Sequence, residues 1–199
     1  LMDAGRLSIC GEESFGTGSD HIREKDGLWA IVAWLNILAF ANKEHAGTSV
    51  ADVLQAHYKQ YGRNFFSRYD YEEVESAGAQ TMMSELRAKV TDPAFLGSTQ
   101  GSFKVAEAGD FSYTDPIDHS VSKNQGLYVR MEDGSRIVFR LSGTGSAGAT
   151  IRLYVEKYSS MAAEYAADVQ EALRPIIDVA LQLSALQRHT GRKEPTVIT

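Results

Sequence analysis

The sequence has a single cysteine, Cys10, among its 199 residues. One cysteine excludes an internal disulfide framework and suits a reducing compartment. No histidine or aspartate stands beside Cys10 in the sequence, so we interpret it as a small buried apolar residue and not as a nucleophile. The shortage of cysteine therefore argues against a disulfide-rich secreted domain and against a thiol enzyme.

Long apolar runs are also absent. The most apolar stretch covers residues 27–41, which is fifteen residues, whereas a helix that crosses a bilayer needs about 20. The N-terminal residues do not have the layout of a secretory signal peptide. We therefore predict a cytoplasmic protein that does not associate with membranes.

Positive charge is in short supply, because 20 lysines and arginines stand against 26 aspartates and glutamates, for a net charge of −6. An acidic chain lacks the broad basic surface that nucleic-acid binding requires, so we predict no nucleic-acid partner. A cluster of arginines in such a chain is better explained as a local site for an anion.

Catalytic groups are scarce as well. The histidines are scattered, and none lies at metal-ligand spacing from Cys10. Asp115 and Asp118 are too isolated to hold magnesium, and no serine and histidine are set out as a nucleophile and its base. We therefore expect this chain to bind a ligand without a metal of its own and without breaking bonds. The histidines are His21, His45, His57, His119 and His189.

The most informative stretch runs from Arg140 to Arg152 and reads Arg-Leu-Ser-Gly-Thr-Gly-Ser-Ala-Gly-Ala-Thr-Ile-Arg. Its glycines let backbone N–H groups approach an anion, its hydroxyls can donate hydrogen bonds, and each terminal guanidinium can form a bidentate fork with phosphate oxygens. We interpret it as a cradle for a phosphate on a small molecule. The candidate ligand-binding residues are Arg140, Ser142, Gly143, Thr144, Gly145, Ser146 and Arg152.

Two other interpretations of this loop exist. Gly143, Gly145 and Gly148 fit the G-x-G-x-x-G dinucleotide fingerprint, which should open a helix. The residues that follow alternate between apolar and polar instead, which is typical of a strand. A glycine-rich turn without a ligand is the second alternative, and the paired arginines favour a ligand over it.

A second polar loop lies near the start of the chain, over residues 11–20. Glu12 and Ser14 within it could exchange hydrogen bonds with the hydroxyls of a sugar, and Lys25 follows closely. A solvated turn is the alternative interpretation. Taken with the arginine loop, this segment predicts the phosphosugar-binding portion of a larger protein, and a chain that starts at Leu1 without methionine fits that hypothesis.

The hydrophobic pattern predicts two successive parts. Residues 27–41 are apolar around the whole circumference of a helix, which predicts a buried helix, and a second helix follows over residues 50–61. We place a domain boundary between Lys59 and Arg63. Beyond it we expect an extended segment at 63–71, a helix at 72–90, strands at 102–105 and 111–113, a hairpin of 125–131 with 136–141, a strand at 150–158, and a helical segment at 161–189 in two pieces that meet near Pro175.

Several long stretches carry a family resemblance. They are Gly-Glu-Glu-Ser-Phe-Gly-Thr-Gly-Ser-Asp-His-Ile-Arg-Glu-Lys-Asp-Gly at Gly11–Gly27, the Arg140–Arg152 loop, Tyr-Gly-Arg-Asn-Phe-Phe from Tyr61, Thr-Gly-Arg from Thr190, and the terminal Pro-Thr-Val-Ile-Thr. Together they resemble the eukaryotic-type phosphoglucomutases of the α-D-phosphohexomutase family. The resemblance extends over essentially the whole chain.

The resemblance implies a fold of four domains around a cleft, of which this chain holds the last part. Residues 1–60 resemble the C-terminal part of the α/β third domain, which carries the sugar-recognition loop. Residues 61–199 resemble the α+β fourth domain, a TBP-like antiparallel sheet with helices that carries the phosphate-binding loop. The expected fold class is thus α/β followed by α+β.

The resemblance also implies roles for particular residues. Glu12 and Ser14 match groups that hydrogen-bond sugar hydroxyls, and Lys25 matches a catalytic-site lysine that contacts the ligand and takes part in proton transfer. The arginine loop matches the site that grips the phosphate that is not being transferred. Its matching side chains are Arg140, Ser142, Thr144 and Arg152, together with the backbone at Gly143, Gly145 and Ser146.

The family reaction interconverts glucose 1-phosphate and glucose 6-phosphate through a phosphoserine enzyme and glucose 1,6-bisphosphate. The family's phosphoserine loop, Thr-Ala-Ser-His-Asn-Pro, and its magnesium loop, Asp-Gly-Asp-Gly-Asp-Arg, belong to earlier domains and do not occur in this sequence. The resemblance therefore implies an inactive chain by itself, with a phosphosugar and the remaining domains as partners, in a monomer or weak dimer. A non-catalytic, adhesion-associated scaffold or a secretion-associated protein is the alternative.

Overall fold

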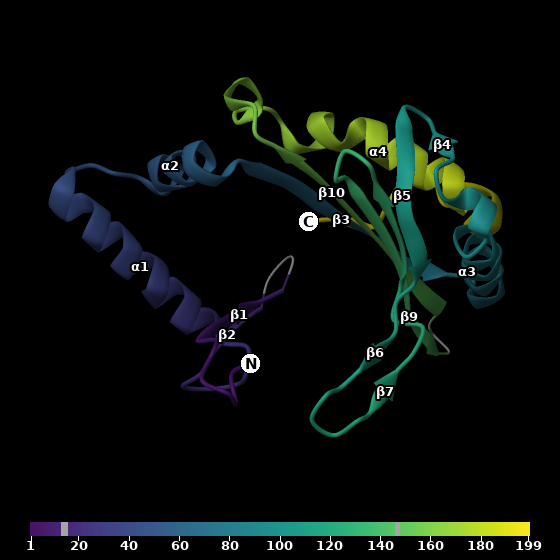
Figure 1. Ribbon diagram of the computed structural model, residues 1–199, viewed down its shortest axis with the longest axis horizontal. Coiled ribbons are helices and arrows are strands. Elements are labelled where there is room, and N and C mark those ends of the chain that lie inside the picture. Colours follow the sequence, from purple (N-terminus) through teal and green to yellow (C-terminus); the bar gives the residue numbers. More distant parts are fainter. Residues whose placement is uncertain (13–15, 146–147) are drawn as a thin grey trace. The chain divides into compact units, whose positions relative to one another are not determined.

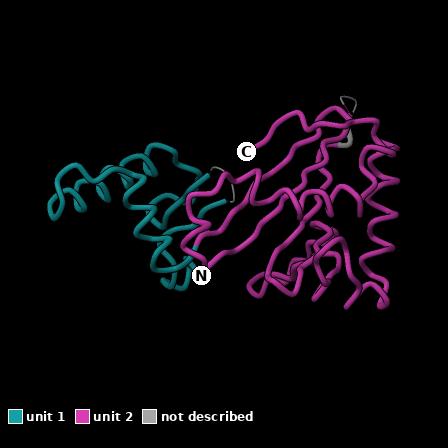
Figure 2. The backbone as a smooth tube through the Cα atoms, turned by 90° about the horizontal axis from the view of Figure 1, so that it is seen from above, with its two compact units in different colours: residues 1–62 teal, residues 63–199 magenta. Residues whose placement is uncertain are grey.

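The computed structural model describes residues 1–12, 16–145 and 148–199 (Figure 1). The backbone divides into two compact units, Leu1–Gly62 and Arg63–Thr199, which are coloured separately in Figure 2. We call them the N-terminal unit and the C-terminal unit.

The N-terminal unit consists of a small strand pair and two helices. Strands β1 (Ile9–Gly11) and β2 (Thr17–Ser19) pair antiparallel, and helices α1 (Gly27–Glu44) and α2 (Val50–Tyr61) follow. The Asp26 carboxylate caps α1 by accepting a 3.0 Å hydrogen bond from the backbone N–H of Trp29. Ser49 and Asp52 form a reciprocal capping box at the start of α2. Both helices therefore begin where local side chains satisfy their first N–H groups.

Helix α1 is exposed to solvent, whereas the sequence pattern predicted that it is buried. The prediction of a buried helix is wrong for the described residues, because none of the residues of α1 is buried. Leu28 is 76% exposed and Phe40 is 66% exposed. Two short strands and one further helix are too little to surround a helix that is apolar on every side. Cys10, also expected to be buried, is exposed in β1.

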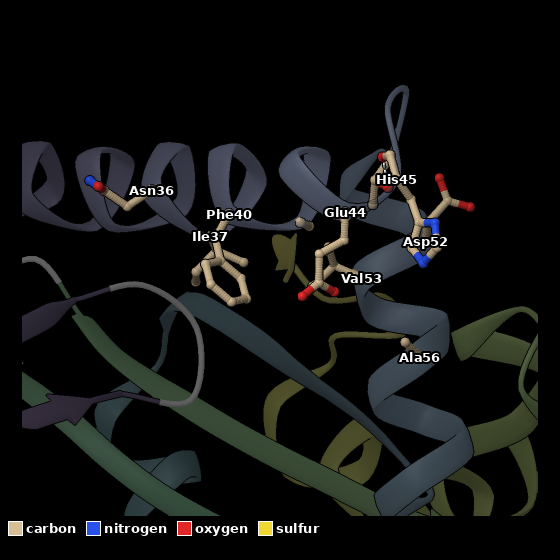
Figure 3. A pocket seen from close by; sticks show the side chains of 10 residues that line it. Asn36, Ile37, Phe40, Glu44, His45, Asp52, Val53 and Ala56 are labelled. Atoms are coloured by element: carbon tan, nitrogen blue, oxygen red, sulfur yellow. Dashed lines mark hydrogen bonds between the residues drawn. The ribbon is translucent and has the colours of Figure 1, made fainter.

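A pocket of about 680 Å³ lies between α1 and α2 (Figure 3). Ile37 and Phe40 project into it from one side of α1, and Val53 and Ala56 line it from α2. Ile37 and Phe40 thus line the pocket and also belong to the apolar surface that α1 leaves exposed.

The C-terminal unit is built on an antiparallel sheet with the strand order β11-β3-β10-β9-β8-β5-β4. Helices α3 and α4 lie on one face of this sheet (Figure 1), and a hairpin of β6 and β7 extends from it. The strands are β3 (Arg63–Val74), β4 (Thr99–Gln100), β5 (Phe103–Asp110), β6 (Tyr113–Thr114), β7 (Val121–Ser122), β8 (Leu127–Met131), β9 (Arg136–Gly145), β10 (Gly148–Ser159) and β11 (Val197–Ile198). The helices are α3 (Ser76–Val90), α4 (Val169–Ser184) and α5 (Leu186–Thr190), with 3₁₀ turns η1 (Pro93–Phe95) and η2 (Ala162–Glu164).

Strand β10 shows how the sheet separates a core from an open face. Ala149, Ile151, Leu153 and Val155 are buried, whereas the residues between them are partly exposed. Side chains alternate across a strand, so the buried set faces α3 and α4 and the polar set faces the opposite side, which we call the open face. The strand after the glycine-rich loop confirms the predicted period and excludes the helix that a dinucleotide fingerprint requires.

Two helix boundaries differ from the sequence-based expectation. Helix α3 begins at Ser76 and not at residue 72, because β3 continues to Val74. The predicted break near Pro175 is wrong, since α4 runs through this proline and the chain breaks at Ala185, where φ is +47°. The apolar face of α4 continues past Pro175 and packs in the core, which offsets the one backbone hydrogen bond that proline removes. No helix in the described part of the chain is both long enough and apolar enough to cross a bilayer.

Candidate functional site

The arginine loop forms the end of the β9–β10 hairpin. Arg140 of β9 is the direct cross-strand partner of Arg152 of β10, and Ser142 is opposite Thr150 in the same way. The alternation along β10 places all four on the open face of the sheet. Antiparallel pairing thus brings the two guanidiniums, twelve positions apart in sequence, to one level of one face.

The hairpin is irregular on both sides of β10 at the same level. In β9 an extra residue lies between the pairs Ser142–Thr150 and Gly145–Gly148, and Gly143 there has a φ of +67°. In β3 an extra residue lies between the pairs formed by Tyr71 and Val74, and Glu73 there has a φ of +53°. Each bulge removes one residue from the ladder of hydrogen bonds and increases the local twist. The bulge at Gly143 therefore leaves backbone in the candidate loop outside regular pairing.

Gly148 is required by its surroundings. Its φ is +92°, and a Cβ atom there would lie 3.1 Å from the carbonyl oxygen of Val74 and 3.2 Å from Cα of Glu73. Both a left-handed backbone and a close approach to β3 therefore demand glycine at this position.

The two arginines differ in their partners. Arg152 Nε lies 3.9 Å from Asp70 Oδ1, and Arg68 Nε lies 3.0 Å from the same oxygen. Among the described residues, no carboxylate forms an ion pair with Arg140. The stem of Arg140 packs over Gly126, where a Cβ would lie 3.1 Å from Arg140 Cγ. Arg140 is therefore the more available cation for an incoming anion.

A cavity of about 720 Å³ adjoins Arg140 on the open face. Two other arginines line it, but Arg130 pairs with Glu107 at 3.1 Å and Arg136 pairs with Glu156 at 2.6 Å. Tyr128 also lines it and donates a 2.9 Å hydrogen bond to Glu107, which raises the pKa of Tyr128. Its remaining walls come from Phe111, Tyr113, Ser122, Gln125, Gly126 and Val138.

In the N-terminal unit, Glu12 and Lys25 meet. Their side chains form a 2.8 Å ion pair, and both are largely exposed to solvent. Gly16 lies against them, because its Cβ would come within 3.1 Å of Glu12 Oε2 and 3.2 Å of Lys25 Cδ. The backbone N–H of Glu12 donates to the carbonyl of Gly16 at 2.9 Å, which closes the loop. An acceptor and a cation therefore lie side by side where a sugar loop is predicted.

Three of the predicted site groups are not among those that the structure describes. Ser14 and Ser146 lie outside the described residues, as does the side chain of Thr144, whereas Gly145 is described through its backbone pairing with Gly148. In the part of the chain that the structure describes, no three histidine, cysteine, aspartate or glutamate side chains are grouped to hold a metal ion. The described residues therefore do not fit magnesium.

Two family models match the chain. Phosphoglucomutase/phosphomannomutase, alpha/beta/alpha domain III, matches residues 1–61, and the Phosphoglucomutase-1 C-terminal domain matches residues 63–196. The chain belongs to the phosphoglucomutase family. This finding confirms the family resemblance and the expected fold class, a mixed α/β part followed by helices on a mainly antiparallel sheet.

Individual phosphoglucomutases are similar along the whole chain. It is 57% identical to phosphoglucomutase-1 of Homo sapiens, with 100% of this chain and 35% of that protein covered. It is also 57% identical to the chloroplastic phosphoglucomutase of Solanum tuberosum, covering 100% of this chain and 32% of that one. The open-form crystal structure of the exocytosis-sensitive phosphoprotein pp63/parafusin, a phosphoglucomutase from Paramecium, superposes with a TM-score of 0.84 at 51% identity, covering 100% of this chain and 34% of that chain. The chain thus spans about a third of the length of these phosphoglucomutases.

Sequence reasoning missed one part of the candidate site in this phosphoglucomutase-family chain. Arg68 and Asp70 occupy the open face of β3 beside Arg152, and the Asp70 side chain is 6% exposed. A pattern that could have revealed them is the alternation of charge with aromatic residues in Arg68-Tyr69-Asp70-Tyr71. That pattern predicts a strand with one charged face and one aromatic face.

Proposed function

We propose that this chain is the phosphosugar-binding portion of a phosphoglucomutase, with residues 1–60 from its third domain and residues 61–199 as its fourth. The observation that supports this most is the position of Arg140 directly opposite Arg152 on an open sheet face. Like charges opposite one another destabilise a sheet. An anion held by both guanidiniums removes that cost, and a phosphate accepts bidentate hydrogen bonds from arginine.

The complete protein would interconvert glucose 1-phosphate and glucose 6-phosphate through a phosphoserine and glucose 1,6-bisphosphate. That bisphosphate must reorient in the active site between the two phosphoryl transfers. One binding site therefore has to accept either of its two phosphates. A loop that recognises charge through guanidiniums, hydroxyls and backbone N–H groups meets this need, because it does not depend on which carbon bears the phosphate. The loop from Arg140 to Arg152 would therefore bind and orient the phosphate that stays in place.

The sugar ring would be recognised by the N-terminal loop through Glu12 and Ser14. Lys25 pairs with Glu12 at 2.8 Å. The Glu12 carboxylate would therefore accept hydrogen bonds both from the Lys25 ammonium and from a bound sugar hydroxyl. A lysine ammonium next to a sugar hydroxyl can contact the ligand and hold a proton close to the reacting oxygen. Magnesium, bound by another domain, would neutralise charge on the transferring phosphoryl group.

The remaining domains are the partner that the N-terminal unit lacks. The exposed apolar sides of α1, with Leu28 and Phe40 among them, would pack against those domains. We propose a monomer or weak dimer in the cytoplasm, although relatives include chloroplastic enzymes. The loop from Arg140 to Arg152 is intact and rich in glycine, which favours an enzyme over an adhesion-associated scaffold or a secretion-associated protein.

The test uses the complete parent protein. Arg152→Ala should raise the KM for glucose 1-phosphate about tenfold or more, because a charge-assisted bidentate contact is lost. The control is Arg188→Ala, an arginine of α5 outside this cavity whose charge is already paired with Glu85 at 2.6 Å, and its KM should stay near the native value. An unchanged KM in Arg152→Ala contradicts the proposal.

A further inference from the structure

We propose that Asp70 is a positioning residue that holds Arg152 toward the bound phosphate. This inference rests on the proposed function of the loop. Asp70 and Arg152 are direct cross-strand partners in β3 and β10, so their side chains leave the sheet at the same level and on the same face. Asp70 therefore lies next to Arg152 in the neighbouring strand and is not part of the loop from Arg140 to Arg152.

The carboxylate of Asp70 is enclosed by cations. Its side chain is 6% exposed, and its Oδ1 atom lies 3.0 Å from Arg68 Nε and 3.9 Å from Arg152 Nε. A buried carboxylate is tolerated only when charges of opposite sign surround it. The Asp70 carboxylate therefore attracts the two guanidiniums at its side.

The geometry leaves Arg152 able to serve a ligand. A charge-assisted hydrogen bond between nitrogen and oxygen is about 2.7–2.9 Å long, so 3.9 Å is an attraction without a hydrogen bond. Within the described residues, the Nε atom of Arg152 is buried and donates no hydrogen bond, the Oδ1 atom of Asp70 accepts none, and the Arg152 side chain as a whole is 39% exposed. Asp70 thus attracts Arg152 without accepting a hydrogen bond from its Nε, and the exposed part of the guanidinium stays available for a phosphate.

The charges also match the ligand class. Arg140 and Arg152 are opposite one another, and Arg68 lies one pair further along the same face, opposite Tyr154. These three arginines carry three positive charges, and Asp70 removes one of them. The remaining charge of about +2 balances a phosphate monoester, which carries about −1.5 to −2 at neutral pH. Without Asp70 the arginines would repel one another more strongly and Arg152 would turn away from Arg140.

The backbone of Asp70 is fixed from its other side. Its carbonyl accepts a 2.7 Å hydrogen bond from the N–H of Thr196, and Val197 of β11 pairs with it. Asp70 therefore lies in an interior strand, and the position of its carboxylate is set by the sheet on both sides.

The experiment is a double-mutant cycle in the complete parent protein, with Asp70→Asn, Arg152→Ala and the two combined. The readouts are KM and kcat for glucose 1-phosphate and the Kd of inorganic phosphate. Asp70→Asn should raise KM and Kd on the order of tenfold in the native background and change neither in the Arg152→Ala background. Its kcat should change much less than its KM, because the residue acts on binding.

The control is Asp110→Asn. Asp110 is also a shielded carboxylate of the same sheet, paired with Arg87 at 2.7 Å, so its loss should lower stability and leave KM and Kd near native values.

If Asp70→Asn does not fold, Asp70→Glu keeps the charge and displaces it, and we expect a smaller rise in KM that again disappears with Arg152→Ala.

The outcomes separate this inference from the proposed function. An effect of Asp70→Asn that is equal in both backgrounds, or no effect at all, overturns the positioning role while Arg152→Ala still weakens binding. If Arg152→Ala itself leaves Kd and KM unchanged, the proposed phosphate-binding function of the loop is contradicted, and with it the positioning role of Asp70.

Discussion

Arg140 and Arg152 are opposed across the β9–β10 ladder, two like charges at one level of one sheet face. Such a pair costs stability in the free protein. Asp70 offsets the cost on the Arg152 side only. The arrangement is therefore best suited to a state in which an anion lies between the two guanidiniums.

This opposition predicts that neutralising Arg140 stabilises the free protein. Arg140→Gln should raise the free energy of unfolding by about 0.5 kcal/mol at low salt, because it removes a repulsion between cross-strand partners. Arg136→Gln is the contrast. Arg136 is opposite Glu156, with which it pairs at 2.6 Å, and on its other side opposite Arg130, so its loss removes an attraction together with a repulsion and should not raise stability. Urea unfolding at about 0.05 M and 1 M salt should show the two effects shrink together as screening increases. A lower stability of Arg140→Gln at low salt contradicts the prediction.

Gly148 should tolerate no side chain. Gly148→Ala combines a φ of +92° with contacts of 3.1 Å to the Val74 carbonyl, and we expect a loss of about 2–4 kcal/mol. Gly134→Ala isolates the backbone term, because Gly134 has a φ of +86° with nothing within 4 Å of the added Cβ; about 1 kcal/mol should be lost there. Chemical denaturation measures both. Equal losses would mean that the close approach to β3 contributes nothing.

The C-terminal unit should fold without the N-terminal unit, and the reverse should not hold. Every member of the hydrophobic core in the described residues lies between Phe65 and Leu186, whereas α1 and α2 contain no buried residue. A fragment of residues 63–199 should show a cooperative unfolding transition. A fragment of residues 1–62 should bind a hydrophobic dye and associate, as gel filtration would reveal. A monomeric, cooperatively folded fragment of residues 1–62 would refute this.

Tyr71 should make the protein sensitive to alkali. Burial, with smaller contributions from Glu194 and Tyr69, raises the pKa of Tyr71 from 10.0 to about 12. The folded state then keeps a proton that the unfolded state loses above pH 10, so this contribution to stability is complete below pH 10 and declines toward pH 12. Tyr71→Phe should make the fall in stability over that range less steep. Tyr61→Phe, at a position 59% exposed, should leave the pH profile of unfolding as it is in the native protein.

The sequence predicted most elements of the fold because their patterns are local. The β8–β9 hairpin and α2 follow from the periodicity of their apolar residues and from the residues that end them. Helix α1 was predicted to be buried because its composition demands burial, but composition does not say which segment supplies the covering surface. The break at Ala185 was missed because proline is a strong local indicator of a helix end, and the packing of α4 overrides it.

The candidate site was predictable only in part. The glycines, hydroxyls and arginines of the loop stand together in the sequence, and the pairing of Glu12 with Lys25 joins residues of one segment. Asp70 is seventy positions before Arg140 and eighty-two before Arg152. Its contact depends on which strand pairs with β10 and in which register, and neither follows from one sequence.

The two bulges have a consequence for engineering the hairpin. Because Gly143 and Glu73 absorb the irregularity just beyond Thr150, residues inserted between Gly145 and Gly148 would lengthen the tip while both guanidiniums kept their places. A single residue inserted between Thr150 and Arg152 would instead turn the arginine inward, against the helices. The length of the hairpin and the positions of its two guanidiniums can thus be changed independently of each other in this protein.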